Sequence, residues 1–133
     1  MKAVVYNTYG GPEVLKIQDV PIPRPKSNEV LIRVDSISLN PVDAKARRGG
    51  FRPMSDLLKF PRITGSDFAG VITETGNRVS GFKVGDTVYG WAQPLLNNGS
   101  AAEMVCISEK AIALAPNNIS LSEASALPCG CLL

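Results

Sequence analysis

The clearest pattern in this sequence is a series of short apolar runs separated by turn-forming residues. Within residues 29–39, the apolar residues Val30, Ile32 and Val34 alternate with polar ones, which predicts a half-buried β-strand. The alternation shifts at residues 36–37, where we expect a β-bulge. Similar runs predict further strands over residues 1–7, 14–20, 69–74, 87–89, 101–107 and 111–115. The pattern indicates a mainly β fold, in the form of a small, partly open β-barrel.

One or two short helices interrupt this pattern. Residues 41–48 begin with Pro41, which suits the first turn of a helix, and are followed by a glycine pair that can end it. Residues 120–128 begin with the Ser-x-x-Glu spacing of a capping box, which ends at Glu123, and predict a helix that closes near the proline at 128. Residues 51–64 are expected to form a loop.

Length and composition are those of a single globular domain. The chain has 133 residues, of which 44% are hydrophobic and 20% charged, with a net charge of +2. The densest basic cluster, Lys45, Arg47, Arg48 and Arg52, is short and has little aromatic interleaving, so we expect no nucleic-acid partner. No apolar run approaches the roughly 20 residues of a membrane-spanning helix, so we expect no membrane partner either.

Three cysteines lie late in the chain, at Cys106, Cys129 and Cys131. Their odd number and the close spacing of the last two do not form a disulfide framework, which predicts a reducing, cytoplasmic location. Cys129-Gly-Cys131 can be read as a fragment of a soft-metal or redox motif. Buried or incidental thiols are the favoured interpretation, because no other ligands cluster there.

Several motifs follow one another from end to end. They are MKAVVY at 1–6, GGPEVL at 10–15, NPVD at 40–43, GSDFAG at 65–70, FKVGDTVYG at 82–90 and LSEASALP at 121–128. Together they resemble the medium-chain dehydrogenase/reductase family, in its zinc-independent quinone oxidoreductase branch. The resemblance implies that residues 1–133 form the GroES-like catalytic domain, which covers the nicotinamide end of the cofactor. It further implies that the Rossmann nucleotide-binding domain is absent from this chain, in which no G-x-G-x-x-G turn occurs.

The same resemblance bears on metal binding. Zinc-dependent members of the family hold a catalytic metal between a cysteine, a histidine and a second cysteine. The matching positions in this sequence are Asn40, Ser66 and, near the third, Cys129. A zinc site needs imidazole or thiolate donors, and the chain contains no histidine. We therefore predict no metal ligands and no zinc.

The activity that the resemblance implies is NADPH-dependent reduction of a small quinone or α,β-unsaturated carbonyl (enone) by hydride transfer. Such a site holds donor and acceptor about 3–3.5 Å apart and supplies a hydrogen bond to the oxygen that gains charge. Asn40 is the first catalytic candidate, because its amide can donate to a carbonyl or orient the nicotinamide. Lys45 is the second, since its ammonium group would attract an enolate or quinol oxygen; a solvated lysine is an equal alternative. Asn40, Leu127 and Pro128 are the predicted NADPH contacts, with the rest of the cofactor held by the missing domain.

Four further residues draw attention near these candidates. Asp43 and Asp67 match positions that are structural, or that support the metal ligands, in zinc relatives. Trp91 and Phe51 are suited to wall an apolar acceptor pocket, although a single aromatic residue more often belongs to the core.

Two other functions stay open. A non-enzymatic co-chaperonin or scaffold sharing the barrel would need ring assembly and a mobile loop, for which residues 53–61 are the candidate. An enoyl-thioester reductase of the same family would need a basic groove, for which Arg47, Arg48 and Arg52 are the candidates. Alone, the chain is expected to be inactive or nearly so. A homodimer is also left open, because family dimers often pair through the missing domain.

Overall fold

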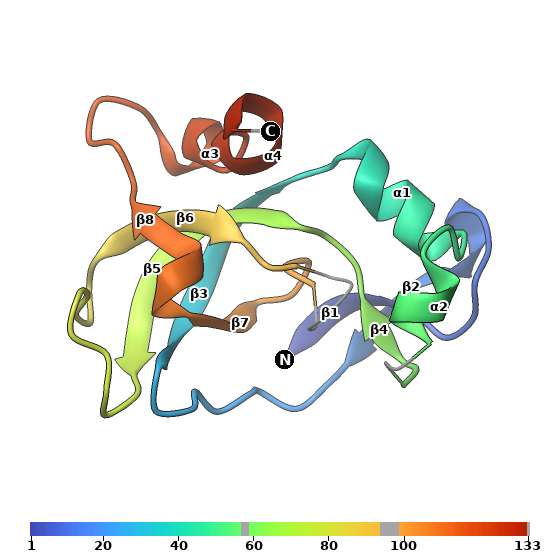
Figure 1. The fold of residues 1–133 in the computed structure, drawn as a ribbon, viewed down its shortest axis with the longest axis horizontal. Coiled ribbons are helices and arrows are strands. Elements are labelled where there is room, and N and C mark those ends of the chain that lie inside the picture. The colour runs from blue at the N-terminus through green and yellow to red at the C-terminus, as the bar shows by residue number, and fades with distance from the viewer. Residues whose placement is uncertain (57–58, 94–98, 133) are drawn as a thin grey trace.

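The computed structural model describes residues 1–56, 59–93 and 99–132, and within them eight strands form two antiparallel sheets (Figure 1). A three-stranded sheet has the order β2-β1-β4, and a five-stranded sheet the order β7-β3-β5-β6-β8. The strands are β1 (Lys2–Tyr6), β2 (Leu15–Asp19), β3 (Glu29–Ser38), β4 (Arg62–Ile63), β5 (Asp67–Thr75), β6 (Thr87–Trp91), β7 (Met104–Ser108) and β8 (Ile112–Leu114). The α-helices are α1 (Pro41–Arg47), α2 (Arg52–Ser55), α3 (Leu121–Ala124) and α4 (Leu127–Leu132), with 3-10 turns η1 (Pro12–Val14) and η2 (Glu109–Ala111). The prediction of a mainly β fold is confirmed.

The long strand β3 organises the larger sheet, because it pairs with β5 on one side and β7 on the other. Its alternating apolar residues Val30 and Ile32 are fully buried and pack against Phe68 and Ile72 of β5. The register with β5 shifts between Val34 and Ser36, one residue earlier than the predicted bulge, and shifts again between Leu31 and Ile32. Val30 and Ile32 thus belong to the main core, as the alternation predicted. Leu31 between them is also buried, so the first part of β3 is covered on both faces and is more buried than the predicted half-buried strand.

The smaller sheet joins the larger one through residues 101–102. Val4 N–H donates to the Ala101 carbonyl at 2.8 Å, and Ala3 forms an isolated bridge with Ala102. A second apolar cluster of Ala3, Val5, Ile63 and Ala101 fills this junction. No continuous ladder closes the two sheets into a full barrel in the part of the chain that the structure describes, which agrees with the partly open form predicted.

The helix after β3 matches its prediction. Helix α1 begins at Pro41 and ends at Arg47, and Gly49 adopts a φ of 81° while donating its N–H to the Ala46 carbonyl. This left-handed conformation favours glycine and ends the helix.

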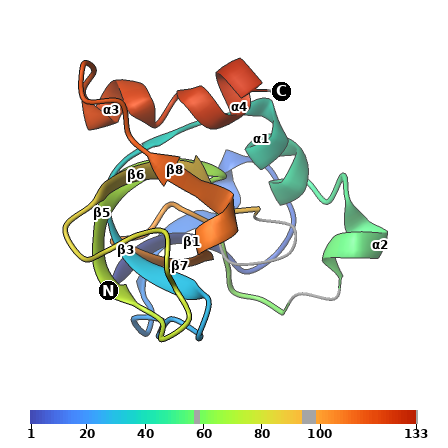
Figure 2. The same cartoon turned by 60° about the vertical axis from the view of Figure 1, so that its left-hand side comes forward.

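The C-terminal segment differs from the single helix predicted over residues 120–128. The capping box is present, since Glu123 N–H donates to Ser120 Oγ at 3.1 Å and Ser120 N–H to Glu123 Oε2 at 2.8 Å. However, α3 ends at Ala124, and Pro128 lies in the first turn of the separate helix α4 instead of ending a helix. Proline is tolerated there because the first-turn N–H groups have no partner within the helix. Both helices cover one face of the five-stranded sheet (Figures 1 and 2).

Other boundaries also needed correction. Residues 51–64, expected to be a loop, include helix α2 and strand β4, and the described residues thus contain four short α-helices where one or two were predicted. The strand expected over 101–107 begins only at Met104, because the backbone at residues 101–102 bonds to the smaller sheet. Residues 57–58 of the predicted 53–61 loop lie outside the described residues. Among the helices described, none has the length and apolar character needed to cross a membrane.

Candidate active site

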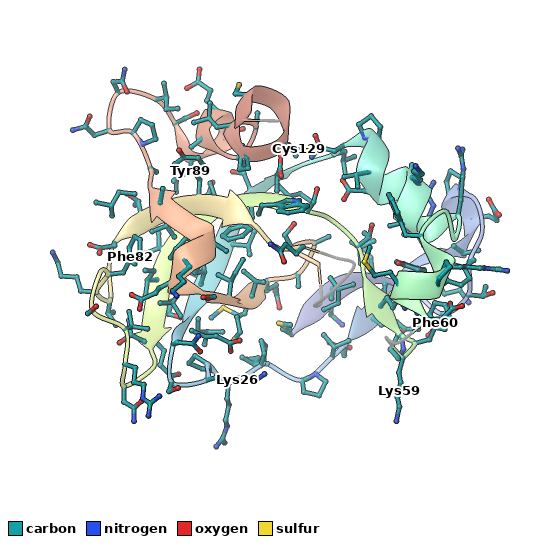
Figure 3. The ribbon with its side chains drawn as sticks, in the orientation of Figure 1. Lys26, Lys59, Phe60, Phe82, Tyr89 and Cys129 are labelled. Atoms are coloured by element: carbon teal, nitrogen blue, oxygen red, sulfur yellow. The ribbon has the colours of Figure 1, made fainter. Side chains whose placement is uncertain are left out.

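Three segments that are distant in sequence meet at one end of the five-stranded sheet. Asn40 follows β3 and is the N-cap of α1, and Asp67 begins β5, where it pairs with Ser38 of β3. Helix α4 reaches the same point, because Cys129 N–H donates to Asp67 Oδ2 at 2.9 Å. In Figure 3, Cys129 is labelled between α4 and α1. The sheet register therefore brings the predicted residue Asn40 next to α4, which carries Leu127 and Pro128.

The carboxylate of Asp67 is the centre of this cluster. Its side chain is fully buried, and Oδ2 accepts from Ser38 Oγ at 3.2 Å and Asn40 Nδ2 at 3.1 Å as well as from Cys129 N–H. The second oxygen, Oδ1, is buried and has no partner among the described residues. A buried carboxylate is costly unless it is hydrogen-bonded, so these three donors are what permit Asp67 to sit there.

The Asn40 amide is oriented by these contacts. Besides Asp67 Oδ2, its Nδ2 lies 3.4 Å from both Ser38 Oγ and Ser66 Oγ. Two amide hydrogens thus face three oxygens inside the protein. Of the two roles predicted for Asn40, orienting a ligand is compatible with this geometry, whereas donating to a substrate oxygen would require an internal hydrogen bond to be given up.

Asp43 places a second carboxylate beside the first. Its side chain is 5% exposed, and Oδ2 accepts the Asn40 N–H at 2.8 Å in the capping box of α1. Burial raises the pKa of Asp43, and the nearby Asp67 carboxylate raises it further; hydrogen bonds from Asn40 and Ser66 and the charge of Arg47 offset part of this. The sequence assigned Asp43 a structural or supporting position, and in the structure its carboxylate caps helix α1.

The donor set at the metal position of zinc relatives does not fit zinc. Asn40 and Ser66 supply an amide and a hydroxyl, and Cys129 is the single thiol of the cluster. Burial and the charges of Asp67 and Asp43 raise the pKa of Cys129, which favours the thiol over the thiolate that zinc requires. Among the described residues, no three His, Cys, Asp or Glu side chains are grouped so that they could hold a metal ion.

An apolar groove of about 400 Å³ adjoins the cluster. It is lined by Tyr89, Gly90, Trp91, Gln93, Lys110, Ala111, Ile112, Ala113 and Pro128. Trp91 pairs with Asp67 in the sheet and Pro128 precedes Cys129, so the groove and the polar cluster share a border. Trp91 therefore lines an apolar groove as predicted, and so does Pro128, one of the predicted cofactor contacts; Leu127 is half-buried and is not among the lining residues.

Lys45 is placed differently from Asn40. It is exposed, and its Nζ lies 4.8 Å from the ring centroid of Phe51, a cation–π contact. Five residues along a helix correspond to a rotation of roughly 140° around its axis, which separates the directions of the two side chains. The Lys45 side chain thus packs on the Phe51 ring and is not part of the Asn40 cluster.

A separate cluster of aromatic and basic side chains surrounds α2 and β4, where Figure 3 labels Phe60. The Arg62 guanidinium is 5% exposed and lies 4.5 Å from the Phe60 centroid, and its Nη1 donates to Tyr9 Oη at 3.0 Å. Arg52 stacks on Tyr9 at 4.7 Å, and Arg47 is buried with its Nε 3.4 Å from the Gly10 carbonyl. Of the three arginines predicted to form a basic groove, Arg47 and Arg52 thus make contacts within the domain.

The sequence reasoning missed Ser38 and the central role of Asp67. A signal for Ser38 exists in the alternation Ser36-x-Ser38-x-Asn40, which places polar side chains on one face at the end of a strand. No comparable signal marks Asp67, because its donors come from residues 27 to 62 positions away.

Comparison with known proteins identifies the family of this domain. Residues 26–117 match the profile of a family described as the alcohol dehydrogenase GroES-like domain. The chain is 42% identical over 134 residues to an NADPH-dependent alkenal/one oxidoreductase of Arabidopsis thaliana, covering 96% of this chain and 34% of that protein. It is also 42% identical over 129 residues to a chloroplast envelope quinone oxidoreductase homolog of the same organism, covering 96% and 39%.

Among solved structures, the quinone oxidoreductase from Coxiella burnetii superposes with a TM-score of 0.93 at 37% identity, covering 99% of this chain and 42% of that one. The expected GroES-like fold is thereby confirmed. In each of these comparisons the chain spans well under half the length of its relative.

Proposed function

Since this chain belongs to the alcohol dehydrogenase GroES-like domain family, in its quinone oxidoreductase and alkenal reductase branch, we propose that it supplies the substrate side of an NADPH-dependent oxidoreductase. The reaction would reduce a small quinone or α,β-unsaturated carbonyl by hydride transfer. The observation that carries this proposal is the polar cluster of Asn40, Asp67 and Cys129, which borders an apolar groove at the position where zinc relatives hold a metal.

The cofactor would meet this chain only at its nicotinamide end. Pro128 and Trp91 offer the apolar surface that a nicotinamide or quinone ring needs, and Asn40 offers a fixed polar group beside it. NADPH itself supplies the hydride. The residues of this chain would orient the ring and exclude water from it, and the remainder of the nucleotide would bind outside this chain.

The two rival functions receive less support. An enoyl-thioester reductase would need free basic side chains for a carrier phosphate, yet Arg47 is buried and Arg52 lies on the Tyr9 ring. A co-chaperonin would need an extended mobile loop over residues 53–61, where Pro53 and Met54 belong to helix α2. The catalytic role of Lys45, the cytoplasmic location and a homodimer stay predictions.

A nicotinamide titration tests the proposal. We expect NADPH fluorescence to show no saturable binding to the chain alone, because residues 1–133 contain no G-x-G-x-x-G turn for the pyrophosphate. Reduced nicotinamide mononucleotide at millimolar concentration should instead perturb the amide NMR signals of Trp91 and Cys129.

The matched variants are Asn40→Ala, which should weaken these perturbations, and Asn28→Ala in an exposed turn, which should not. Perturbations confined to residues far from the groove, or tight binding of NADPH by the chain alone, would contradict the proposed division of roles.

A further inference from the structure

The Asn40 amide nitrogen donates its hydrogen bonds to oxygens inside the protein. Its Nδ2 lies 3.1 Å from Asp67 Oδ2 and 3.4 Å from the hydroxyls of Ser38 and Ser66. An amide NH₂ has two hydrogens, so these three oxygens can use all of its donor capacity.

Asp67 decides which way the amide faces. A serine hydroxyl can donate or accept, so Ser38 and Ser66 would tolerate either orientation of the amide. A carboxylate only accepts. If the amide turned over, Asn40 Oδ1 would face Asp67 Oδ2 at about the same distance, and two acceptors would repel each other in a buried place.

Asp67 itself has little freedom to move. Its side chain is fully buried, its Oδ2 also accepts from Ser38 Oγ and Cys129 N–H, and its backbone carbonyl accepts from Ser100 Oγ at 2.9 Å. The direction of the Asn40 amide is thus fixed by Asp67, which contacts of the sheet and of α4 hold in place.

With Nδ2 turned inward, Oδ1 is the side-chain atom that remains. Asn40 is partly exposed at the N-cap of α1, and Oδ1 is not among the buried polar atoms that lack a partner. A carbonyl oxygen accepts two hydrogen bonds, so even when it caps the first turn of α1 it has capacity for a further donor.

We propose that Asp67 is a positioning residue that holds the Asn40 amide nitrogen inward and leaves Oδ1 as the hydrogen-bond acceptor for a ligand, and thereby selects a ligand group that carries an N–H or O–H. This assignment rests on the proposed function for the identity of the ligand. In that setting the donor is either the carboxamide NH₂ of the nicotinamide or the hydroxyl of a quinol product. Asn40 then holds a ring in place and does not polarise the carbonyl of the substrate.

The orientation is tested on the full chain without any ligand. Solvent exchange of the Asn40 side-chain NH₂, followed by ¹⁵N NMR, should be at least about tenfold slower than that of the exposed Asn28. Asp67→Asn should speed this exchange by about tenfold, because a neutral acceptor replaces a charged one. Asp86→Asn is the matched control, since Asp86 accepts the Lys83 N–H in a distant turn, and it should leave Asn40 unchanged.

The comparison within the wild-type chain holds even if the Asp67 variant does not fold. Exchange at Asn40 as fast as at Asn28 would overturn the proposal, and so would an Asp67→Asn variant that folds and leaves this exchange unchanged.

Ligand titrations then test the acceptor role and separate it from the proposed function. Nicotinamide should shift the Asn40 side-chain signals more than N,N-diethylnicotinamide, which lacks the N–H, if the cofactor is the donor. Hydroquinone should do so more than its dimethyl ether if the product is the donor. Equal shifts within both pairs would overturn the acceptor assignment. A protected Asn40 amide with no response to any of the four compounds would contradict the proposed function and leave the positioning by Asp67 intact.

Discussion

Replacing Gly70 by alanine adds one methyl group and tests how closely strands β3 and β5 approach each other. It lies in β5, opposite Val34 of β3 and Val88 of β6, in the middle of the five-stranded sheet. A Cβ added there would meet the Arg33 carbonyl oxygen at 2.2 Å and Ile32 Cγ2 at 2.8 Å. Carbon and oxygen atoms normally stay about 3.3 Å apart, so β3 and β5 would have to separate by roughly 1 Å.

The cost of this separation can be estimated for Gly70→Ala. Overpacking accounts for about 2 kcal/mol, and two weakened backbone hydrogen bonds add about 1 kcal/mol each. The lower flexibility of alanine in the unfolded chain returns about 0.7 kcal/mol. We therefore expect a loss of about 3 kcal/mol in the free energy of unfolding. For a domain of this size that corresponds to a drop of about 10 °C in Tm.

Gly130→Ala is the matched control, because among the described residues outside its own helix no atom lies within 4 Å of a Cβ at this position. It should leave stability unchanged or raise it by up to about 1 kcal/mol. Urea unfolding followed by far-UV circular dichroism and by the fluorescence of the single tryptophan measures both variants. A Gly70→Ala variant within about 0.5 kcal/mol of the wild type would refute the close approach of β3 and β5.

Three further outcomes follow from the same structure. Ser120→Ala should cost about 1 kcal/mol, because it removes the hydroxyl that caps α3; urea unfolding measures this, and an unchanged midpoint would contradict the cap. The pKa of Asp43 is raised above 3.8 by burial, so the stability that its protonated form contributes is present below that pH and is lost as the pH rises through the raised pKa. Asp43→Asn should flatten this part of the curve of unfolding free energy against pH, and an identical slope in both proteins would refute the assignment. Iodoacetamide at pH 8 should modify the exposed Cys131 first, then Cys129, and last Cys106, which is half-buried and whose pKa is raised to about 12 by that burial; mass spectrometry follows the order, and early modification of Cys106 would contradict its raised pKa.

The candidate site was only partly predictable from the sequence. Asn40 and Pro128 were identified by resemblance; Asn40 belongs to the polar cluster, and Pro128 lines the apolar groove that adjoins it. Asp67 was assigned a structural or supporting role, yet its carboxylate joins Asn40 to Cys129 across 27 and 62 positions of sequence. For Lys45, the local charge pattern does not reveal that the side chain lies on the ring of Phe51.

The sequence by itself determined the features that depend on neighbouring residues. Strand β3, the capping box of Ser120 and Glu123, and the glycine that ends α1 are such features, because the apolar pattern of a strand and the hydrogen bonds at a helix end involve residues only a few positions apart.

Only the tertiary structure decided the features that depend on distant partners. Strand β4 exists because Ile63 pairs with Val5, and the expected strand over residues 101–107 is shortened because Ala101 bonds to Val4. The division of the C-terminal segment at residues 125–126 likewise accompanies the bond from Cys129 to Asp67. Each of these contacts joins residues more than 50 positions apart, and a local pattern carries no information about which distant backbone group will be the partner.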